Sequence, residues 1–231
     1  MAPRRSAPPS QHSWWQFVEQ ERDGPAAGVF RAVGAERLSH LYFPLVNDAG
    51  MLSWTSPQLH GGPAVSHHEH LSPPLTAEDL PHTLLHRDVW ITEEGGSPFS
   101  LSGVSPAGLA SHASVRKHPP ALIEAGPGWF TLTRHDPRGR FTVRGTLWCP
   151  ADIREPLECF QIEVVNTSAG RLTFQPYAAI PVFARSADNV RDHRHVTALL
   201  HRAVLVPHGV VVSPAMSFDE RGHRLNATRY A

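Results

Sequence analysis

Hydrophobic and polar residues alternate most regularly in the middle of the chain. Phe130 and Leu132 alternate with two threonines, and residues 141–147 repeat the same period of two. Successive side chains of a strand point to opposite faces, so this period predicts strands with one buried face. Between the two runs, residues 135–139 read His-Asp-Pro-Arg-Gly, which is a chain-reversing signal. We therefore expect an antiparallel hairpin over residues 130–147.

Other stretches repeat the pattern. Residues 160–164 alternate in the same way, and a turn signal at 166–170 precedes Leu172 and Phe174, which predicts a second hairpin. Residues 14–19 fit a short helical turn or an edge strand. Residues 196–206 fit either type of element, and their Val and Thr content favours a strand. Several hairpins in one chain are typical of an all-β fold, here a large antiparallel β-sandwich.

The C-terminal residues continue this pattern. Residues 210–219 predict a strand and its exit, residues 220–224 a turn, and the segment from Leu225 the beginning of a further strand. No polar tail follows that last strand in the sequence. We therefore expect the sandwich to be incomplete at its C-terminus.

Composition agrees with a globular β protein. The chain has 231 residues, of which 41% are hydrophobic and 18% charged, and its 22 prolines and 17 glycines favour many turns. We expect a disordered or short-helical segment over residues 1–27 and one β domain over residues 28–231. The net charge is zero, which disfavours nucleic acid and anionic membranes as partners.

We infer the cellular compartment from membrane-spanning and secretion signals, neither of which the sequence contains. No apolar run approaches the roughly 20 residues that span a bilayer. The basic N-terminus is not followed by the hydrophobic segment of a secretion signal. Cys149 and Cys159 lie in apolar surroundings without a CxxC spacing, so we expect a reduced structural pair in a cytoplasmic protein.

The densest polar segment spans residues 185–195 and permits three interpretations. His193 and His195 would share one face of an extended segment and bind a metal, although three neighbouring arginines would repel a cation. Asp188 and Asp192 would instead form internal ion pairs with those arginines. In the third interpretation the arginines bind a polar ligand or a partner chain, because a guanidinium offers a planar fork of donors.

Other candidate motifs are weak. Residues 67–70 read His-His-Glu-His, and the prolines that follow at 73 and 74 favour an extended loop over a helical HExxH site. With 16 histidines in the chain, solvated or hydrogen-bonded rings are the better interpretation of this cluster. The sequence contains neither a phosphate-binding GxxxxGK[ST] loop nor a GxSxG nucleophile motif. Local motifs therefore assign no catalytic residue.

Two longer blocks, residues 41–61 and 177–223, resemble the N-terminal supersandwich domain of family 94 glycoside phosphorylases, the cellobiose-phosphorylase-like enzymes. Weaker landmarks lie between them in the same order: Trp90, residues 97–100, Gly103 and residues 157–172. The segment at 97–100 reads Ser-Pro-Phe-Ser, where the family usually has Gly-Pro-Trp-Ser. Any role tied to that tryptophan is therefore not carried over.

The resemblance implies a reaction and its partners. Such enzymes cleave β-glucosides with inorganic phosphate as co-substrate, invert the anomeric centre and release α-glucose 1-phosphate. The general acid lies on a separate (α/α)₆ barrel, so we assign no catalytic residue, no cofactor and no metal to this chain. Its implied partners are an oligosaccharide, the barrel and a second copy in a homodimer. The candidate residues near the active site or an interface are Arg185, Asp188, Asn189, Arg191, Asp192, His193, Arg194, His195, Asp219, Glu220, Arg221 and His223.

Two alternatives stay open. A stand-alone carbohydrate-binding sandwich would present exposed aromatic faces to sugars, and the tryptophans to inspect are Trp54, Trp90, Trp129 and Trp148. A His-rich metal-binding protein is the third hypothesis.

Overall fold

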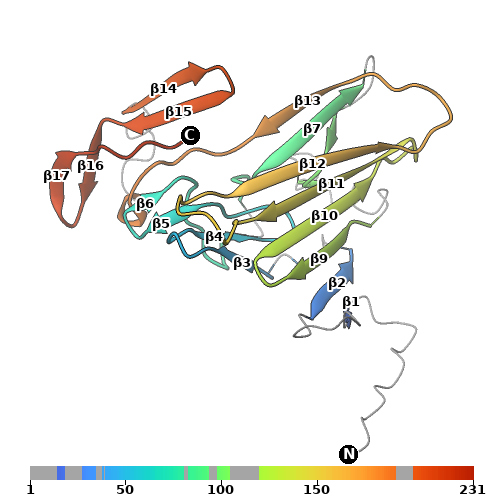
Figure 1. Ribbon diagram of the computed structural model, residues 1–231, viewed down its shortest axis with the longest axis horizontal. Helices are drawn as coiled ribbons and strands as arrows, with labels where there is room; N and C mark the ends of the chain where they lie inside the picture. The colour runs from blue at the N-terminus through green and yellow to red at the C-terminus, as the bar shows by residue number, and fades with distance from the viewer. Residues whose placement is uncertain are drawn as a thin grey trace, which may run out of the picture.

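The computed structural model describes residues 15–18, 28–34, 38, 40–80, 83–93, 98–104, 120–190 and 200–231. Within these ranges the chain is built of antiparallel strands and one short 3₁₀ helix, which confirms the all-β prediction. Figure 1 shows a large twisted sheet, two smaller sheets beside it, and two hairpins at one end of the molecule. In the described residues, no helix has the length and apolar character needed to cross a membrane.

The largest sheet has six strands. Their order is β1 (Trp15–Val18), β2 (Val29–Val33), β9 (Leu122–Gly126), β10 (Trp129–His135), β11 (Phe141–Trp148) and β12 (Cys159–Asn166). Residues 15–18 pair with β2, so the N-terminal segment contains an edge strand rather than a helical turn. The predicted hairpin at 130–147 is confirmed as β10 and β11, with Phe130 opposite Leu147 and Leu132 opposite Gly145.

The turn of this hairpin is formed by the predicted residues. The amide of Asp136 donates to the carbonyl of Phe141 at 2.9 Å, and the amide of Gly139 donates to the carbonyl of Asp136 at 2.8 Å. Gly139 has a φ of 69°, a left-handed conformation that glycine adopts without steric cost. Asp136 and Gly139 therefore close the hairpin in the way that the turn signal in the sequence predicted.

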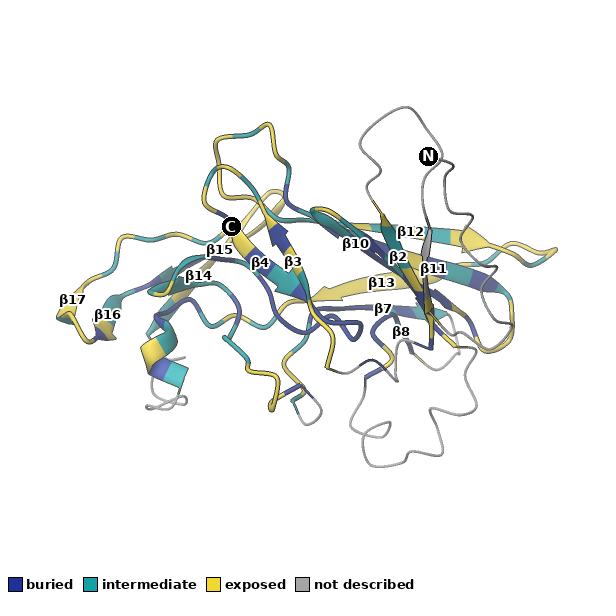
Figure 2. Ribbon diagram, turned by 90° about the horizontal axis from the view of Figure 1, so that it is seen from below, coloured by how far each residue is buried: buried dark blue, intermediate teal, exposed yellow. Residues whose placement is uncertain are grey.

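Two smaller sheets complete the body. One has the order β3 (Phe43–Val46), β4 (Leu52–Thr55), β5 (Ala64–Ser66) and β6 (Glu69–His70). The other has the order β13 (Phe174–Ala179), β7 (Asp88–Glu93) and β8 (Phe99–Ser100). Buried residues concentrate where these strands face the six-stranded sheet, as Figure 2 shows.

The core is packed between these layers. Phe43 on β3 lies 5.2 Å, centroid to centroid, from Phe130 on β10, and Phe99 on β8 lies 5.3 Å from Phe141 on β11. Fully buried Leu45 adds to the same cluster. Side chains from two layers thus interdigitate as in a sandwich. Phe99, from the Ser-Pro-Phe-Ser segment, is a core residue.

The predicted second hairpin is wrong. β12 pairs with β11 at the edge of the six-stranded sheet, whereas β13 pairs with β7 in a different sheet. Residues 167–173 carry the chain between the layers, and Leu172 packs against the core on the way. The alternating pattern identified both strands, but it specifies a face and not a partner.

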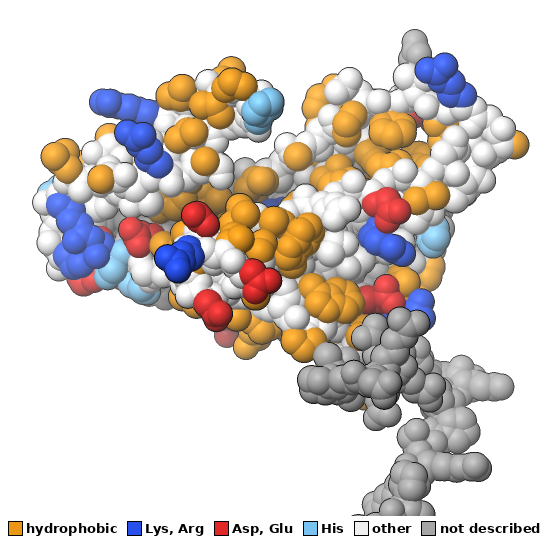
Figure 3. Space-filling view, in the orientation of Figure 1, with side chains coloured by type: hydrophobic (Ala, Val, Ile, Leu, Met, Phe, Trp, Pro, Cys, Tyr) orange, Lys and Arg blue, Asp and Glu red, His pale blue; other side chains and the backbone are white. Residues whose placement is uncertain are grey.

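Two hairpins follow near the C-terminus: β14 (His201–Val206) with β15 (Gly209–Pro214), and β16 (Met216–Asp219) with β17 (Gly222–Leu225). The strand preferred for residues 196–206 is confirmed from His201 onward, while residues 196–199 lie outside the described ranges. Hydrophobic side chains gather over β14 and β15 at the upper left of Figure 3.

The strand expected to begin at Leu225 is wrong in its position. β17 ends at Leu225, and beyond it only Tyr230 forms a bridge, with Val212. Asp219 pairs directly with Gly222, so the turn contains just Glu220 and Arg221. Gly222 has a φ of 88° and permits this tight reversal, which the sequence analysis had spread over five residues.

Candidate functional site

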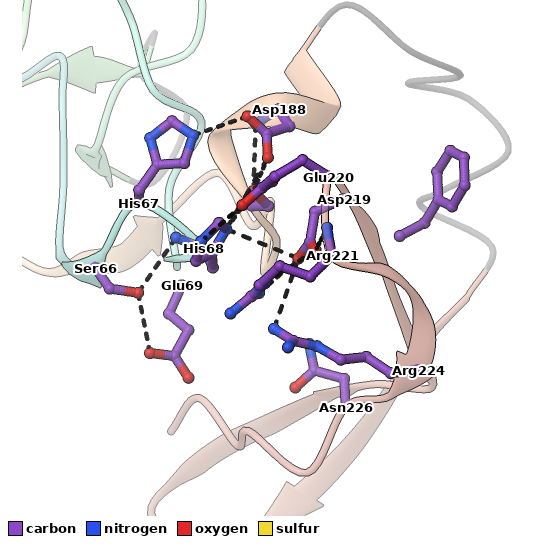
Figure 4. A network of polar contacts seen from close by, with 12 residues as sticks. Ser66, His67, His68, Glu69, Asp188, Asp219, Glu220, Arg221, Arg224 and Asn226 are labelled. Carbon is purple, nitrogen blue, oxygen red and sulfur yellow. Dashed lines mark hydrogen bonds and ion pairs between the residues drawn. The ribbon is translucent and has the colours of Figure 1, made fainter.

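Three chain segments meet at the end of the molecule that carries the C-terminal hairpins. They are the turn between β5 and β6, the 3₁₀ helix η2 (Ala187–Val190), and the turn between β16 and β17 (Figure 4). The sequence places these segments about 120 and 30 residues apart, as the contacts of Asp188 with His67 and of Asn189 with Phe218 show. We call the residues that meet there, His67, His68, Asp188, Asp219, Glu220 and Arg221, the histidine–carboxylate cluster.

Backbone pairing brings the first two segments together. His70 and Arg185 exchange amide–carbonyl hydrogen bonds of 2.8 and 3.0 Å, and the amide of Ala187 donates to the carbonyl of His67 at 2.8 Å. The side-chain amide of Asn189, which is buried, donates to the carbonyl of Phe218. The helix is therefore fixed to the β5–β6 turn on one side and to β16 on the other.

The two histidines contact carboxylates from both of the other segments. Nε2 of His67 lies 2.8 Å from Oδ1 of Asp188, and Nε2 of His68 lies 3.0 Å from Oε1 of Glu220. Nδ1 of His68 lies 3.8 Å from Oδ2 of Asp219 and 4.0 Å from Oδ2 of Asp188. His68 is thus the central side chain, with carboxylates facing both of its ring nitrogens.

Asp219 is anchored by arginine. Its side chain has no exposed surface, and Nε and Nη2 of Arg221 donate to its two oxygens at 3.0 and 2.5 Å. Arg224 lies 3.7 Å away. Burial alone would raise the pKa of Asp219, but the hydrogen bonds from Arg221 outweigh it and hold the pKa below its ordinary value. Asp219 is therefore a charged, structurally fixed group.

Asp188 is more exposed and also acidic. Hydrogen bonding with the Glu220 carboxyl group, and next the bond from His67, lowers the pKa of Asp188 well below its usual range. The hydroxyl of Ser186 donates to Oδ2 of Asp188 at 3.1 Å. Asp188 therefore stays ionised at any pH at which the protein is expected to work.

The structure brings some of the candidate site residues together and places others elsewhere. Asp188, Asp219, Glu220 and Arg221 meet in the cluster, and Asn189 fixes its backbone. Arg185 is buried behind it, where burial lowers the pKa of the guanidinium. His223 instead packs at a tilt against Phe218, with ring centroids 4.3 Å apart. The remaining candidates lie outside the described residues: Arg191, Asp192, His193, Arg194 and His195.

His67 and His68 were not among the candidate site residues. Solvated or hydrogen-bonded rings were expected at these positions, and the hydrogen bonds are confirmed, with carboxylates more than 100 residues later as partners. The only available signal was that polar loops of this length are uncommon without a use. Asp188, which the ion-pair interpretation assigned to nearby arginines, pairs with His67.

The cysteines fit a structural role. Both are free thiols, and Sγ of buried Cys149 lies 3.4 Å from the carbonyl of Leu45. Burial, and next the charge of Glu158, raises the pKa of the Cys149 thiol to about 12. A thiol that stays protonated is a poor nucleophile.

Comparison with known proteins assigns no function, so the function is argued from the geometry of the site. No protein-family model matches the sequence, and no curated protein matches it.

Proposed function

We propose that this chain is the N-terminal sandwich domain of an inverting glycoside phosphorylase that acts in the cytoplasm on β-glucosides such as cellobiose or β-1,2- and β-1,4-oligoglucans. The observation that carries the proposal is the convergence of Asp188 with Asp219, Glu220 and Arg221. These are residues that the resemblance assigns to the surface near the active site. They come from separate segments and form one ordered polar surface.

The chemistry of an inverting phosphorylase gives the barrel and the sandwich different roles. Phosphate takes the place of the attacking water of an inverting hydrolase, and a carboxylic acid on the barrel protonates the leaving oxygen. The sandwich supplies no reacting group and instead presents fixed polar loops. Arg221 and Arg224 keep donors in solvent while Asp219 holds their position, since their side chains are 36% and 42% exposed. A guanidinium fixed in this way suits sugar hydroxyls or phosphate.

Exposed apolar side chains support a further domain as partner. Along β13 and the residues after it, Tyr177, Ile180 and Val182 are 58%, 52% and 43% exposed. Exposed apolar side chains that gather in one region of a folded protein can form an interaction site. In the proposal, the helical barrel and a second copy of the protein cover such surfaces. Free thiols agree with a reducing compartment.

Expression of the complete open reading frame that contains these residues tests the proposal. With inorganic phosphate and β-linked glucose disaccharides, the protein should release glucose 1-phosphate, and proton NMR should show the α-anomer. Arg221→Ala should raise the KM for the sugar or phosphate without abolishing turnover. A frame that encodes no helical domain, or a protein that releases no glucose 1-phosphate from any β-linked glucoside, would overturn it.

One observation favours a second candidate, a stand-alone carbohydrate-binding sandwich. Tyr42 is 65% exposed and packs edge-on against Trp54, with ring centroids 6.1 Å apart. Trp54, Trp90, Trp129 and Trp148 are all half-buried. An exposed aromatic ring held by another can stack on a sugar. Affinity electrophoresis in β-glucan gels should then show retardation that Tyr42→Ala removes, and equal mobility of the two proteins would exclude this role.

A further inference from the structure

The histidine–carboxylate cluster has an arrangement that goes beyond the proposed function. We propose that His67, His68 and Asp188 bind a divalent transition-metal ion, with Glu220 orienting His68. Each of the three residues offers a donor atom within 4.8 Å of the other two. We assign Nε2 of His67 and Nδ1 of His68, which face the Asp188 carboxylate. Binding moves the proton that Nε2 of His67 shares with Asp188 to Nδ1 of that ring. Imidazole and carboxylate donors in this combination suit Zn²⁺ and related ions.

The hydrogen bonds determine which nitrogen of His68 is free to bind. Nε2 of His68 faces Oε1 of Glu220 at 3.0 Å, and a carboxylate accepts a hydrogen bond, so the ring proton belongs on Nε2. The Nδ1 lone pair then faces inward. Histidines that bind metals characteristically donate their other ring N–H to a carboxylate, and Glu220 occupies that position.

Among the described residues, the polar groups around Nδ1 of His68 are one hydroxyl and two carboxylates. The hydroxyl of Ser186 lies 3.2 Å away, but it is also 3.1 Å from Oδ2 of Asp188, an ionised acceptor that takes its only proton. Carboxylate oxygens of Asp188 and Asp219 lie 4.0 and 3.8 Å from Nδ1. An inward-facing lone pair beside the Asp188 carboxylate is an arrangement that a metal ion completes.

Charge and access favour the metal ion. Arg221 and Arg224 neutralise Asp219, and Figure 4 shows them on the side of Asp219 away from Asp188. Among the ion pairs of the described residues, Asp188 pairs with His67 and His68 and has no arginine within 4.0 Å, so its carboxylate stays available to a divalent ion. The side chains of His67 and Asp188 are 60% and 34% exposed, so an ion can enter from solvent.

The required rearrangement is small. Tetrahedral Zn²⁺ holds its ligands at about 2.0–2.2 Å, which places donor atoms about 3.3 Å apart. The present separations are 2.8 Å from Nε2 of His67 to Oδ1 of Asp188, and 4.0 Å from Nδ1 of His68 to Oδ2 of the same carboxylate. Each differs from that value by less than about 1 Å. With three protein ligands, the fourth position is left to water or to an oxygen of a bound sugar or phosphate.

Titration of the metal-stripped chain with Zn²⁺ by calorimetry, and with Co²⁺ by visible absorption, tests the site. The expected result is one equivalent bound with tetrahedral Co²⁺ absorption. His67→Gln and Asp188→Asn should remove this equivalent, and Glu220→Gln should weaken it about 10- to 100-fold. His208→Gln is the matched control, because His208 is an exposed histidine in the β14–β15 turn, and it should bind as the unaltered chain does.

Far-UV circular dichroism and thermal melting of each variant separate loss of the site from loss of the fold, and His67→Gln alters the most exposed ligand. Zn²⁺ should raise the melting temperature of the unaltered chain and leave that of His67→Gln unchanged. Absence of stoichiometric binding, or equal binding by His67→Gln and the unaltered chain, would overturn the proposal. Either result leaves the phosphorylase proposal to its own test.

Discussion

At the scale of single residues, the most consequential buried group is Arg87. It is 1% exposed, forms an ion pair with Glu158, and donates from Nη2 to the carbonyl of Trp54 at 2.9 Å. Ser53 donates to the same carboxylate. The ion pair joins the residue before β7 to the residue before β12, and its hydrogen bonds add β4, so the pair links segments next to all three sheets of the body.

Replacing one partner of this ion pair should lower the free energy of unfolding by more than replacing both partners. Arg87→Met should lower the free energy of unfolding by about 3–5 kcal/mol, because it leaves the Glu158 carboxylate buried and uncompensated. The double variant Arg87→Met with Glu158→Leu should recover a large part of that loss. Urea denaturation of the two single variants and the double variant measures the coupling. Strictly additive losses would contradict it.

His60 makes stability depend on pH. The ring is buried, Ser56 contacts its Nδ1 at 2.9 Å, and its Nε2 lies 3.3 Å from the carbonyl of Thr83. Burial, and next the nearby His86, lowers the pKa of His60 to about 4. Between pH 6.5 and 4 the unfolded chain therefore binds a proton that the folded chain does not, and stability falls as the solution is acidified.

The contribution of His60 is measurable by difference. From pH 7 to pH 5 it should remove about 2 kcal/mol of stability, at 1.36 kcal/mol per pH unit below the unfolded pKa. Urea midpoints of the unaltered chain should fall across this range by more than those of His60→Gln. The exposed-site variant His208→Gln serves as control and should follow the unaltered chain. Parallel pH profiles for His60→Gln and the unaltered chain would show that the ring is not held neutral.

At the scale of elements, the sequence was sufficient to predict strand pairing where the two strands are consecutive in the chain. The β10–β11 hairpin followed from its alternation and its Asp-Pro-Arg-Gly turn. The same reasoning failed for β12 and β13, because residues 166–170 look like a hairpin turn while the chain moves to another layer. Alternation and turn composition are properties of neighbouring residues in the sequence. The partner of β13 depends instead on the layer against which the preceding Leu172 packs, which neighbouring residues do not determine.

The six-stranded sheet contains glycines that its packing requires, and Gly145 is one of them. Gly145 lies in β11, and a Cβ there would lie 2.7 Å from Leu101 and 2.8 Å from Phe160. Gly145→Ala should lower the free energy of unfolding by about 1–3 kcal/mol, because buried side chains have to shift. Gly209→Ala in β15 meets no atom within 4 Å and should be neutral or slightly stabilising. Thermal melts that rank the two variants in the opposite order would contradict this packing argument.

At the scale of the whole molecule, the candidate site lay beyond local sequence patterns. Asp188 and residues 219–221 were identified as candidates through the resemblance, but their partners His67 and His68 lie over 100 residues earlier. The contact depends on the bridge between His70 and Arg185, which joins segments from different sheets. Neither charge nor spacing in the sequence encodes that bridge, so the ligand set became visible only in three dimensions.

The exposed apolar surface of the C-terminal hairpins leads to a prediction about association. Leu205 on β14 and Leu225 on β17 are 84% and 91% exposed, and Val204 is 59% exposed. Two copies of the chain can remove such side chains from water by packing these hairpins together, and burial of a leucine contributes roughly 1.5–3 kcal/mol. Sedimentation velocity should therefore show concentration-dependent association. Leu205→Lys with Leu225→Lys should weaken it by at least about tenfold.

Leu157 supplies the control for this experiment. It is 44% exposed, it lies in the loop before β12, and Leu157→Lys should leave the association constant unchanged. If association came from general stickiness of exposed apolar residues, both lysine variants would weaken it similarly. A chain that stays monomeric over the whole concentration range would contradict the prediction, because it would show that the hairpins tolerate exposure of their leucines without a partner. Selective loss in the hairpin variant would instead place the contact surface on β14 and β17, next to the histidine–carboxylate cluster.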